Sequence, residues 1–298
     1  MIKKLLLIMT ICFNAIIANS QDIYSNLFHN DFSELNSAYV GFLESKQVLF
    51  YTSGYDNFNS DLNSSIGRMA INIPVSKIHS GFGIHTSYSK YYIFSDLDFG
   101  VIYSFKYKIT DNIKVSLGTN FSIFRRGAKG TVINYDSGYG FYDIDESVYL
   151  YNLDMGFWIN MYGFQIGLSN KHINEPSGKT RFLDTDTIKS RMNLILNYDF
   201  HIAQKHTFGN SLLILNLKDF FDRQYIIINN QFKINNKFII GLSTEIYKSK
   251  DISTYISPNI GFNLSNKFNF IMSVNLIKIN PMYYLRENKI SAVLNYNF

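Results

Sequence analysis

Residues 96–109 read DLDFGVIYSFKYKI, and their side chains alternate between apolar and polar. Successive side chains of a β-strand point to opposite faces, so this stretch predicts a strand with one apolar and one polar face. Only Ile102 interrupts the polar face. The apolar face would carry Leu97, Phe99, Val101, Tyr103, Phe105, Tyr107 and Ile109.

The same two-residue period recurs along the chain, for instance in FWINM (157–161) and in the final stretch NKISAVLNYNF (288–298). It predicts an all-β protein of about 14 strands. The predicted strands are 46–54, 65–73, 80–88, 96–108, 112–124, 147–160, 162–173, 189–199, 210–217, 224–234, 237–247, 253–264, 267–278 and 288–298.

The connections between these strands fall into a short class and a long class. The short ones are at 110–112, 162–163, 235–236 and 265–266, and the longer ones are at 125–146, 174–188, 218–223 and 279–287. If the first strand leads away from the periplasm, all the short turns lie on one rim and all the long loops on the other. An even number of strands with this asymmetry is typical of a transmembrane antiparallel β-barrel of the outer membrane.

The composition favours this barrel over a soluble one. Charged residues make up 17% of the chain and aromatic residues 16%, whereas a soluble domain is usually about a quarter charged. Fourteen strands of ~10 residues would also enclose a tube too wide for side chains alone to fill. We therefore expect the apolar face to meet lipid, with tyrosines at strand ends, such as Tyr88, Tyr91, Tyr92, Tyr283 and Tyr284, in the interfacial girdles.

The N-terminus predicts export. Lys3 and Lys4 precede the apolar run 5–11, and Ala18-Asn19-Ser20 supplies the small residues of a cleavage site. We expect a cleaved signal peptide at 1–20, a periplasmic N-terminal segment at 21–45 that plugs the lumen or docks a partner, and the barrel at 46–298. Removal of the signal peptide lowers the formal charge of +5 to about +3, which gives no case for binding nucleic acid.

The segment after the signal peptide carries a pattern of its own. Gln21, Asp22, Ser25 and Asn30 are followed by Asn36, Ala38, Tyr39 and Gly41. This spacing resembles the start of mature PorP/SprF-like proteins of the type IX secretion and gliding machinery of Bacteroidota. The customary prolines are replaced by Asp31 and Ser37.

A second stretch, YNLDMGFWINMYGFQIGLSNKHINEP (151–176), is similar to the strand, turn and strand of that family with its G-L-S-x-x-H-x-x-x-P ending. Gly156, Gly167, Leu168, Ser169, His172 and Pro176 occupy those places. The resemblance implies an integral outer-membrane protein that helps a large secreted surface protein, often an adhesin, through the type IX pathway or holds it at the surface. Its candidate partner-docking residues are Asn30, Asn36, Ala38, Tyr39, Gly41 and His172.

Three cations follow the fifth predicted strand at the expected outer rim: Arg125, Arg126 and Lys129. Guanidinium groups can bind phosphate oxygens bidentately, so these residues are candidates for contact with lipopolysaccharide, with an ordinary solvated rim as the equal alternative.

The sequence offers no enzyme site. Its six histidines lack metal-binding spacing, and the only cysteine, Cys12, lies within the expected signal peptide. Ser169 and His172 are three residues apart, which places them on opposite faces of a strand and argues against a catalytic pair. We therefore expect no catalytic, cofactor or metal residues. The alternative function is a passive outer-membrane channel or hydrophobic-solute transporter, whose lumen would include Lys106, Lys108, Gln165 and Glu245.

Overall fold

The computed structural model describes residues 27–57, 64–91, 93–134, 140–179, 184–185, 187–203, 205–215, 224–248, 252–265, 267–274, 277–279 and 287–298. The expected signal peptide, its cleavage site and the residues Gln21, Asp22 and Ser25 lie outside these ranges. In the described parts, no helix has both the length and the apolar character needed to cross a membrane.

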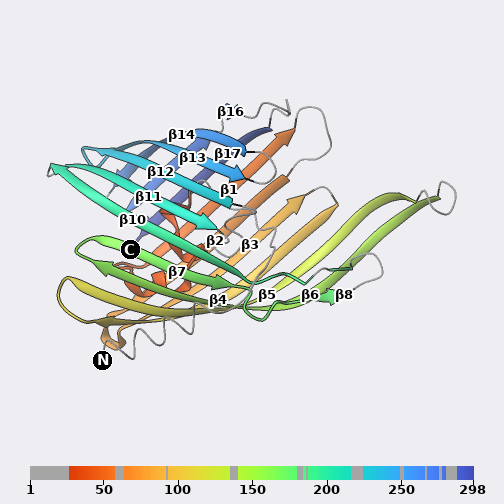
Figure 1. Cartoon of the computed structure of the whole chain (residues 1–298), viewed down its shortest axis with the longest axis horizontal. Helices are drawn as coiled ribbons and strands as arrows, with labels where there is room; N and C mark the ends of the chain where they lie inside the picture. Colours follow the sequence, from red (N-terminus) through yellow and green to blue (C-terminus); the bar gives the residue numbers. More distant parts are fainter. Residues whose placement is uncertain are drawn as a thin grey trace.

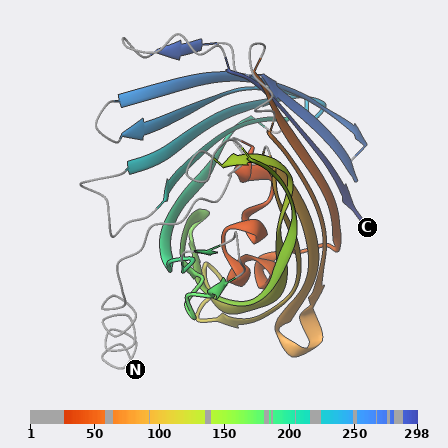
Figure 2. The same cartoon turned by 90° about the vertical axis from the view of Figure 1, so that its right-hand side faces the viewer.

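The chain forms a closed antiparallel β-barrel (Figures 1 and 2). Each strand pairs with its neighbour in sequence, β1 pairs with β17, and β13 pairs with β14. The barrel strands are β1 (Gln47–Asn57), β2 (Ser64–Val75), β3 (Ser80–Tyr91), β4 (Phe94–Lys108), β5 (Ile113–Asn134), β6 (Gly140–Met161), β7 (Phe164–Lys171), β10 (Arg191–Ala203), β11 (His206–Leu215), β12 (Gln224–Ile234), β13 (Phe238–Lys248), β14 (Ile252–Ser265), β15 (Phe268–Val274) with β16 (Ile277–Ile279), and β17 (Glu287–Asn297).

Counting β15 and β16 as one interrupted strand, because both pair with β14, the barrel has the fourteen strands that the sequence predicts. A separate small sheet joins β8 (Gly178–Lys179) and β9 (Asp184–Thr185).

The prediction of a long loop at 125–146 is wrong. β5 and β6 stay paired from Ile113 opposite Met161 to Asn134 opposite Gly140. The hairpin projects well beyond the rest of the barrel (Figure 1). Polar and charged residues such as Arg126, Lys129 and Asp145 interrupt the apolar alternation there. Outside the membrane, a strand needs only its backbone hydrogen bonds and no apolar face. The alternation of apolar side chains therefore ends before the strand does.

The outer wall carries the apolar band. On β4 the outward side chains from Leu97 to Tyr107 are each roughly half exposed, whereas Ile102 and Ser104 point inward and are buried. These outward residues span ~33 Å of strand at ~3.3 Å per residue, or ~25 Å along the membrane normal for a ~40° tilt. That height matches the apolar band of an outer-membrane barrel.

Two of the predicted short turns show backbone geometry suited to tight hairpins. Tyr162 and Gly163 have φ angles of 54° and 86°, and Asn235 and Asn236 both have φ of 53°. Positive φ at both central residues gives a twist that matches the flanking strands. These turns lie on the same rim as Lys46 and the final residue, Phe298, whose backbone nitrogen donates to the Lys46 carbonyl at 3.0 Å.

Candidate functional site

The lumen of the barrel is occupied by residues 27–45, which we call the lumen segment (Figure 2). It forms three short 3-10 helices: η1 (Phe28–Asn30), η2 (Phe32–Glu34) and η3 (Ser37–Phe42). The side chain of Asp31 caps η2 by accepting from the Ser33 nitrogen, and Asn36 caps η3 by accepting from the Ala38 nitrogen, both at 3.0 Å. Such caps satisfy the free N–H groups at a helix start.

Glycines on four strands make room for the lumen segment. A Cβ atom added to Gly81 on β3 would lie 2.6 Å from the Val40 carbonyl oxygen, and one added to Gly118 on β5 would lie 2.4 Å from the Ala38 nitrogen. A Cβ atom added to Gly156 on β6 would lie 2.1 Å from Asn36 Oδ1, and one added to Gly167 on β7 would lie 2.4 Å from the Trp158 ring and 3.0 Å from Asn36 Nδ2. A side chain at Gly81, Gly118 or Gly156 would collide with the segment, and one at Gly167 would collide with Trp158, which packs against the segment, so the inner wall is shaped to receive it.

Asn36 joins the lumen segment to the middle of the chain. Its side-chain nitrogen donates to the carbonyl oxygens of Phe157 on β6 and Leu168 on β7, both at 2.9 Å. Its side-chain oxygen lies against Gly156. The two stretches that carry the family resemblance are therefore the two sides of one contact.

An aromatic cluster seals this contact. Trp158 points into the lumen and is fully buried. Its ring centroid is 4.9 Å from that of Tyr39 and 5.3 Å from that of Phe32. The cluster continues onto β10, β11 and β12 through Ile195, Leu213 and Ile227. Leu27 enters a second cluster with Leu49, Tyr51, Ile239, Ile271 and Val293. Burial of each large apolar side chain contributes about 1.5–3 kcal/mol, so the segment is firmly held.

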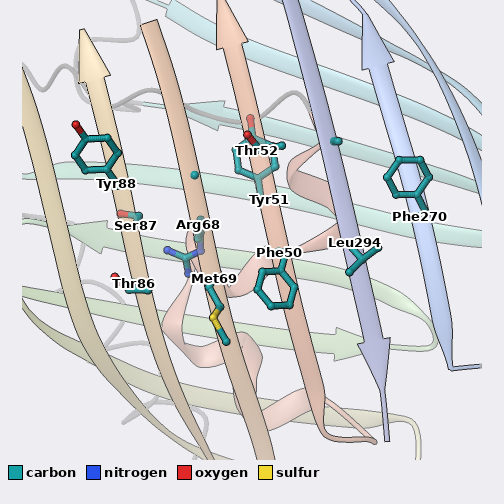
Figure 3. Close-up of a pocket in the computed structure, with 12 residues that line it drawn as sticks. Phe50, Tyr51, Thr52, Arg68, Met69, Thr86, Ser87, Tyr88, Phe270 and Leu294 are labelled. Atoms are coloured by element: carbon teal, nitrogen blue, oxygen red, sulfur yellow. The ribbon is translucent and has the colours of Figure 1, made fainter.

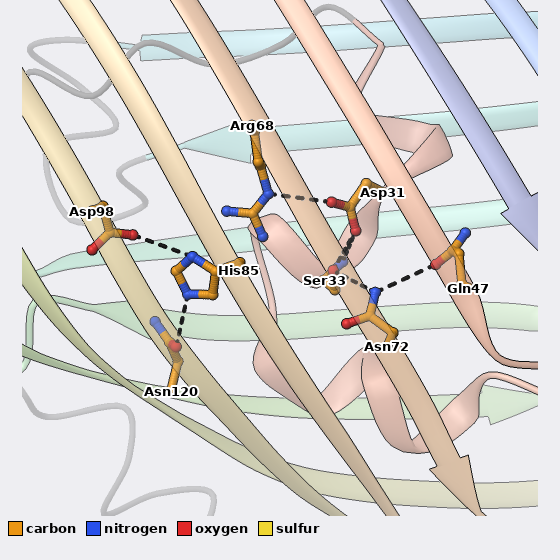
Figure 4. A network of polar contacts seen from close by, with 8 residues as sticks. All are labelled: Asp31, Ser33, Gln47, Arg68, Asn72, His85, Asp98 and Asn120. Atoms are coloured by element: carbon orange, nitrogen blue, oxygen red, sulfur yellow. Dashed lines mark hydrogen bonds and ion pairs between the residues drawn. The ribbon is translucent and has the colours of Figure 1, made fainter.

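A polar network fixes the other side of the segment (Figure 4). Arg68 on β2 forms an ion pair with Asp31, with Nε 3.4 Å from Oδ2 and both side chains 6% exposed. Asp31 also accepts from the Ser33 hydroxyl, and Asn72 Nδ2 donates to Ser33 Oγ at 3.2 Å. A buried ion pair tolerates the loss of one partner badly, because the remaining charge is left in a low-dielectric site.

His172 belongs to a second polar network on the same wall. His85 contacts Asp98 at 3.2 Å and Asn120 at 3.0 Å (Figure 4), and Asn120 Nδ2 donates to Asp154 Oδ2 at 2.9 Å. Asp154 Oδ1 in turn accepts from the His172 backbone nitrogen at 2.8 Å.

The backbone of His172 is left-handed, with φ of 56°, and its ring nitrogen Nδ1 lies 2.7 Å from Asn152 Oδ1. The chain therefore turns at His172, directly after β7, and side chains of β6 hydrogen-bond to this turn. The hydroxyl of Ser169, the residue weighed as its catalytic partner, accepts from Asn193 Nδ2 on β10 at 3.4 Å.

Burial changes the proton affinity of the lumen segment. It lowers the pKa of His29 from 6.5 to about 3, with a smaller contribution from Lys233. The same desolvation raises the pKa of Glu34 and of the Tyr39 phenol. His29 Nε2 contacts Asn30 Nδ2 at 2.8 Å and the side-chain amide of Gln231 on β12. His29 is thus neutral at neutral pH.

The structure places the candidate docking residues inside the barrel. Asn36, Ala38 and Gly41 are buried, and Asn30 and Tyr39 are partly exposed. Asn30 Nδ2 donates to the Leu27 carbonyl at 3.2 Å. A partner would reach the three buried residues only if the segment left the lumen.

The three outer cations do not form one cluster. Arg126 makes a bidentate pair with Asp96, at 2.9 and 3.0 Å, and Lys129 lies 3.3 Å from Asp145. Arg125 is exposed on the outer face, opposite Tyr149. Adjacent residues of a strand face opposite ways, so Arg125 and Arg126 cannot grip one phosphate together.

A separate hollow of about 490 Å³ lies on the lipid-facing wall (Figure 3). Phe50, Met69, Tyr88, Phe270 and Leu294 line it together with Gly67, where an added Cβ would meet nothing within 4 Å. Its lining is almost wholly apolar, as its place in the lipid-facing band requires.

Sequence reasoning missed most of the contact partners on the barrel wall. Trp158 is the only tryptophan, and it stands at an inward position of a strand whose other face is apolar. A large aromatic side chain at an inward position, together with inward glycines on neighbouring strands, is the sequence feature that indicates a segment packed inside the lumen.

The comparisons with known proteins agree with this architecture. The family described as "Type IX secretion system membrane protein PorP/SprF" matches residues 17–280. Among proteins with curated functions, none is significantly similar in sequence.

Several solved outer-membrane proteins share the fold. A Pseudomonas aeruginosa FadL homologue aligns with a TM-score of 0.52 and 10% identity over 88% of this chain and 93% of its own. The Pseudomonas putida toluene transporter TodX gives 0.55 and 8% over 94% and 95%. The Ralstonia pickettii toluene transporter TbuX gives 0.54 and 10% over 95% of each chain. At these identities the likeness concerns the fold alone.

Proposed function

Because the chain belongs to the PorP/SprF family of type IX secretion system membrane proteins, we propose that it is a non-enzymatic barrel that helps one secreted protein, such as a large adhesin, to cross or stay attached to the outer membrane. The chain is an outer-membrane β-barrel protein. Its partners would be the secreted protein, components of the secretion machinery and the surrounding lipid.

One observation carries the proposal: the lumen segment lies inside the barrel and is tied to its wall by Asn36, Trp158 and the Asp31–Arg68 pair. A solute pore benefits from an open, wetted lumen. A docking protein benefits instead from a rigid body that presents fixed surfaces on both sides of the membrane.

The projecting hairpin of β5 and β6 supports a role at the cell surface. It extends beyond the other strands on the rim opposite the short turns (Figure 1). Outside the barrel β4 stops pairing with it at Phe94 opposite Ala128. The hairpin thus offers a stiff surface for a secreted protein.

Deleting the protein tests the proposal. Surface display of type IX cargo would be compared in the parent, the deletion strain and the complemented strain by surface proteolysis and mass spectrometry of the medium. We expect one cargo protein to be retained in the periplasm or shed, and complementation to restore it. Unchanged display of every cargo protein in the deletion strain contradicts the proposal.

A second candidate is a channel for hydrophobic solutes. The apolar clusters of the lumen favour it, as does the fold shared with the toluene transporters TodX and TbuX. Conductance and toluene uptake measured with the purified protein in bilayers separate the two. Solute flux that depends on the protein supports the channel, and the absence of both conductance and uptake supports the docking protein.

A further inference from the structure

The rim with the short turns is strongly basic. Within the described residues, this rim comprises the turns at 76–79, 109–112, 162–163, 205, 235–237 and 267, the chain entering β1 at 43–46, and the six residues of each strand nearest the turns. This region holds nine lysines and three acidic residues, Glu44, Asp111 and Asp199. Its excess of six positive charges is larger than the +5 of the whole chain. The positive charge of the molecule is therefore gathered on the rim expected to face the periplasm.

Three of these lysines crowd together at the mouth of the lumen. Lys108 on β4 lies directly opposite Lys114 on β5, and Lys106 lies two residues along the same face. All three share the inner face with Ser104 and Ser116, which are buried.

Like charges placed directly opposite on neighbouring strands destabilise a sheet. Asp111 pairs with Lys108, but no acidic side chain in the described part of the chain is within ion-pair distance of Lys114. A cluster that costs stability in the free protein is explained by an anion that neutralises it when bound.

The other lysines continue the basic surface around the same mouth. Lys233 on β12 follows the inward, buried Gln231 on the same face, and it lies close enough to influence His29. Lys205, Lys237 and Lys267 are exposed at the turns. Cations arranged around a low-dielectric opening focus their field into it and attract negatively charged partners.

We propose that this basic mouth, centred on Lys106, Lys108 and Lys114, binds an acidic segment, rich in Asp and Glu, of a periplasmic partner protein. Membrane phosphate groups lie around the outer circumference, where Lys46 packs 5.5 Å from the Phe298 ring. The three clustered lysines face the opposite way, toward the lumen, which favours a protein segment over lipid.

Such a segment would reach the base of the lumen segment, since Gly41 packs against Ser104 and Ser116 on the same face as the lysines. The proposal rests on the proposed function only in that the partner would belong to the secretion machinery. The binding of an acidic peptide can be measured whether or not the protein takes part in secretion.

The test uses the full chain in nanodiscs of neutral lipid and a fluorescein-labelled poly-glutamate peptide, with binding followed by anisotropy. The variant Lys106→Gln/Lys108→Gln/Lys114→Gln removes the cluster. The matched control, Lys90→Gln/Arg125→Gln/Lys129→Gln, removes three cations from the side with the projecting hairpin. We expect the first variant to bind the peptide at least tenfold more weakly, and the control to bind it as the parent does.

A second arm distinguishes lipid from protein as the partner. The same variants would be tested for flotation with anionic phosphatidylglycerol vesicles. Equal loss of peptide binding in both variants overturns the proposal, as does unchanged peptide binding in the first. Loss of vesicle binding without loss of peptide binding assigns the cluster to lipid and also overturns it. Normal cargo display in a deletion strain refutes the proposed function but leaves this binding result intact.

Discussion

The side-chain nitrogen of Asn36 lies 2.9 Å from the carbonyl oxygen of Leu168, a residue 132 positions further along the chain. The same amide donates to Phe157 and caps η3. One residue thereby joins the lumen segment to two adjacent strands.

Asn36→Ala removes these three hydrogen bonds at once. It also leaves buried carbonyl groups with fewer donors, so we expect a loss of about 2–4 kcal/mol in the stability of the docked segment. This loss of stability can be measured as faster protease cleavage of the lumen segment in outer-membrane preparations. Asn30→Ala removes only local contacts of a partly exposed residue, with the Leu27 carbonyl and the neighbouring His29 ring, and should have little effect. Equal accessibility in both variants would argue against the contact.

Gly156→Ala should displace the lumen segment, because the new Cβ would lie 2.1 Å from Asn36 Oδ1. Gly67→Ala is the matched control, since its Cβ points into open space on the outer wall. We expect trypsin or chymotrypsin to cleave the segment faster only in the first variant. If both variants resist protease as the parent does, the close packing described for Gly156 is incorrect.

Replacing Arg68 by Met leaves Asp31 as a buried, unpaired carboxylate, which typically costs about 3–5 kcal/mol. The double variant Arg68→Met/Asp31→Leu removes both charges and should recover most of the stability. Thermal unfolding followed by circular dichroism or heat modifiability measures both. A double variant as unstable as the single one would show that the pair is not the source of the loss.

The docking of the lumen segment should weaken in acid. The pKa of His29 is about 3 in the docked segment against 6.5 when it is exposed. The exposed state therefore binds the proton between these values, and the stability contributed by neutral His29 is lost as the pH falls below 6.5. We expect protease accessibility to rise from pH 7 to pH 5.

The variant His29→Gln isolates this effect. The raised pKa of Glu34 acts in the opposite direction, because the stability of its docked, protonated form is lost as the pH rises through that pKa. Glu34 is present in both proteins, so the difference between them reports His29. Identical pH profiles would exclude His29 as the acid-sensitive group.

Arg125 is the outer cation best placed to meet lipopolysaccharide, since Arg126 and Lys129 are paired with acids. It lies beside Leu97 at the upper end of the apolar band on β4. We expect Arg125→Ser to reduce co-purification of lipopolysaccharide, whereas Lys205→Ser, on the other rim, should not. Unchanged lipopolysaccharide content in the Arg125 variant removes this contact from the account.

The alternation of side chains was enough to predict the barrel wall, because lipid imposes the same two-residue period on every strand. Leu97 to Tyr107 illustrate this on β4. The two-residue period does not predict where strands end beyond the membrane. There β5 and β6 continue through Arg126, Lys129 and Asp145 without an apolar face.

The interior was harder to predict because its signals are distant in sequence. The family resemblance singles out Asn36, but its partners Phe157 and Leu168 accept through backbone carbonyl groups, which every residue has. Inward glycines such as Gly118 likewise have meaning only once the segment they accommodate is known.

The position of the lumen segment can be measured with one designed crosslink. A Cβ added to Gly41 would lie 3.5 Å from the Cβ of Ser104, a separation that suits a disulfide. With Cys12 replaced by serine, the variant Gly41→Cys/Ser104→Cys would be oxidised in intact outer membranes and analysed by mass spectrometry, beside the two single-cysteine variants. We predict a disulfide between residues 41 and 104 in most molecules of the double variant, and free thiols at both positions would contradict the docked lumen segment.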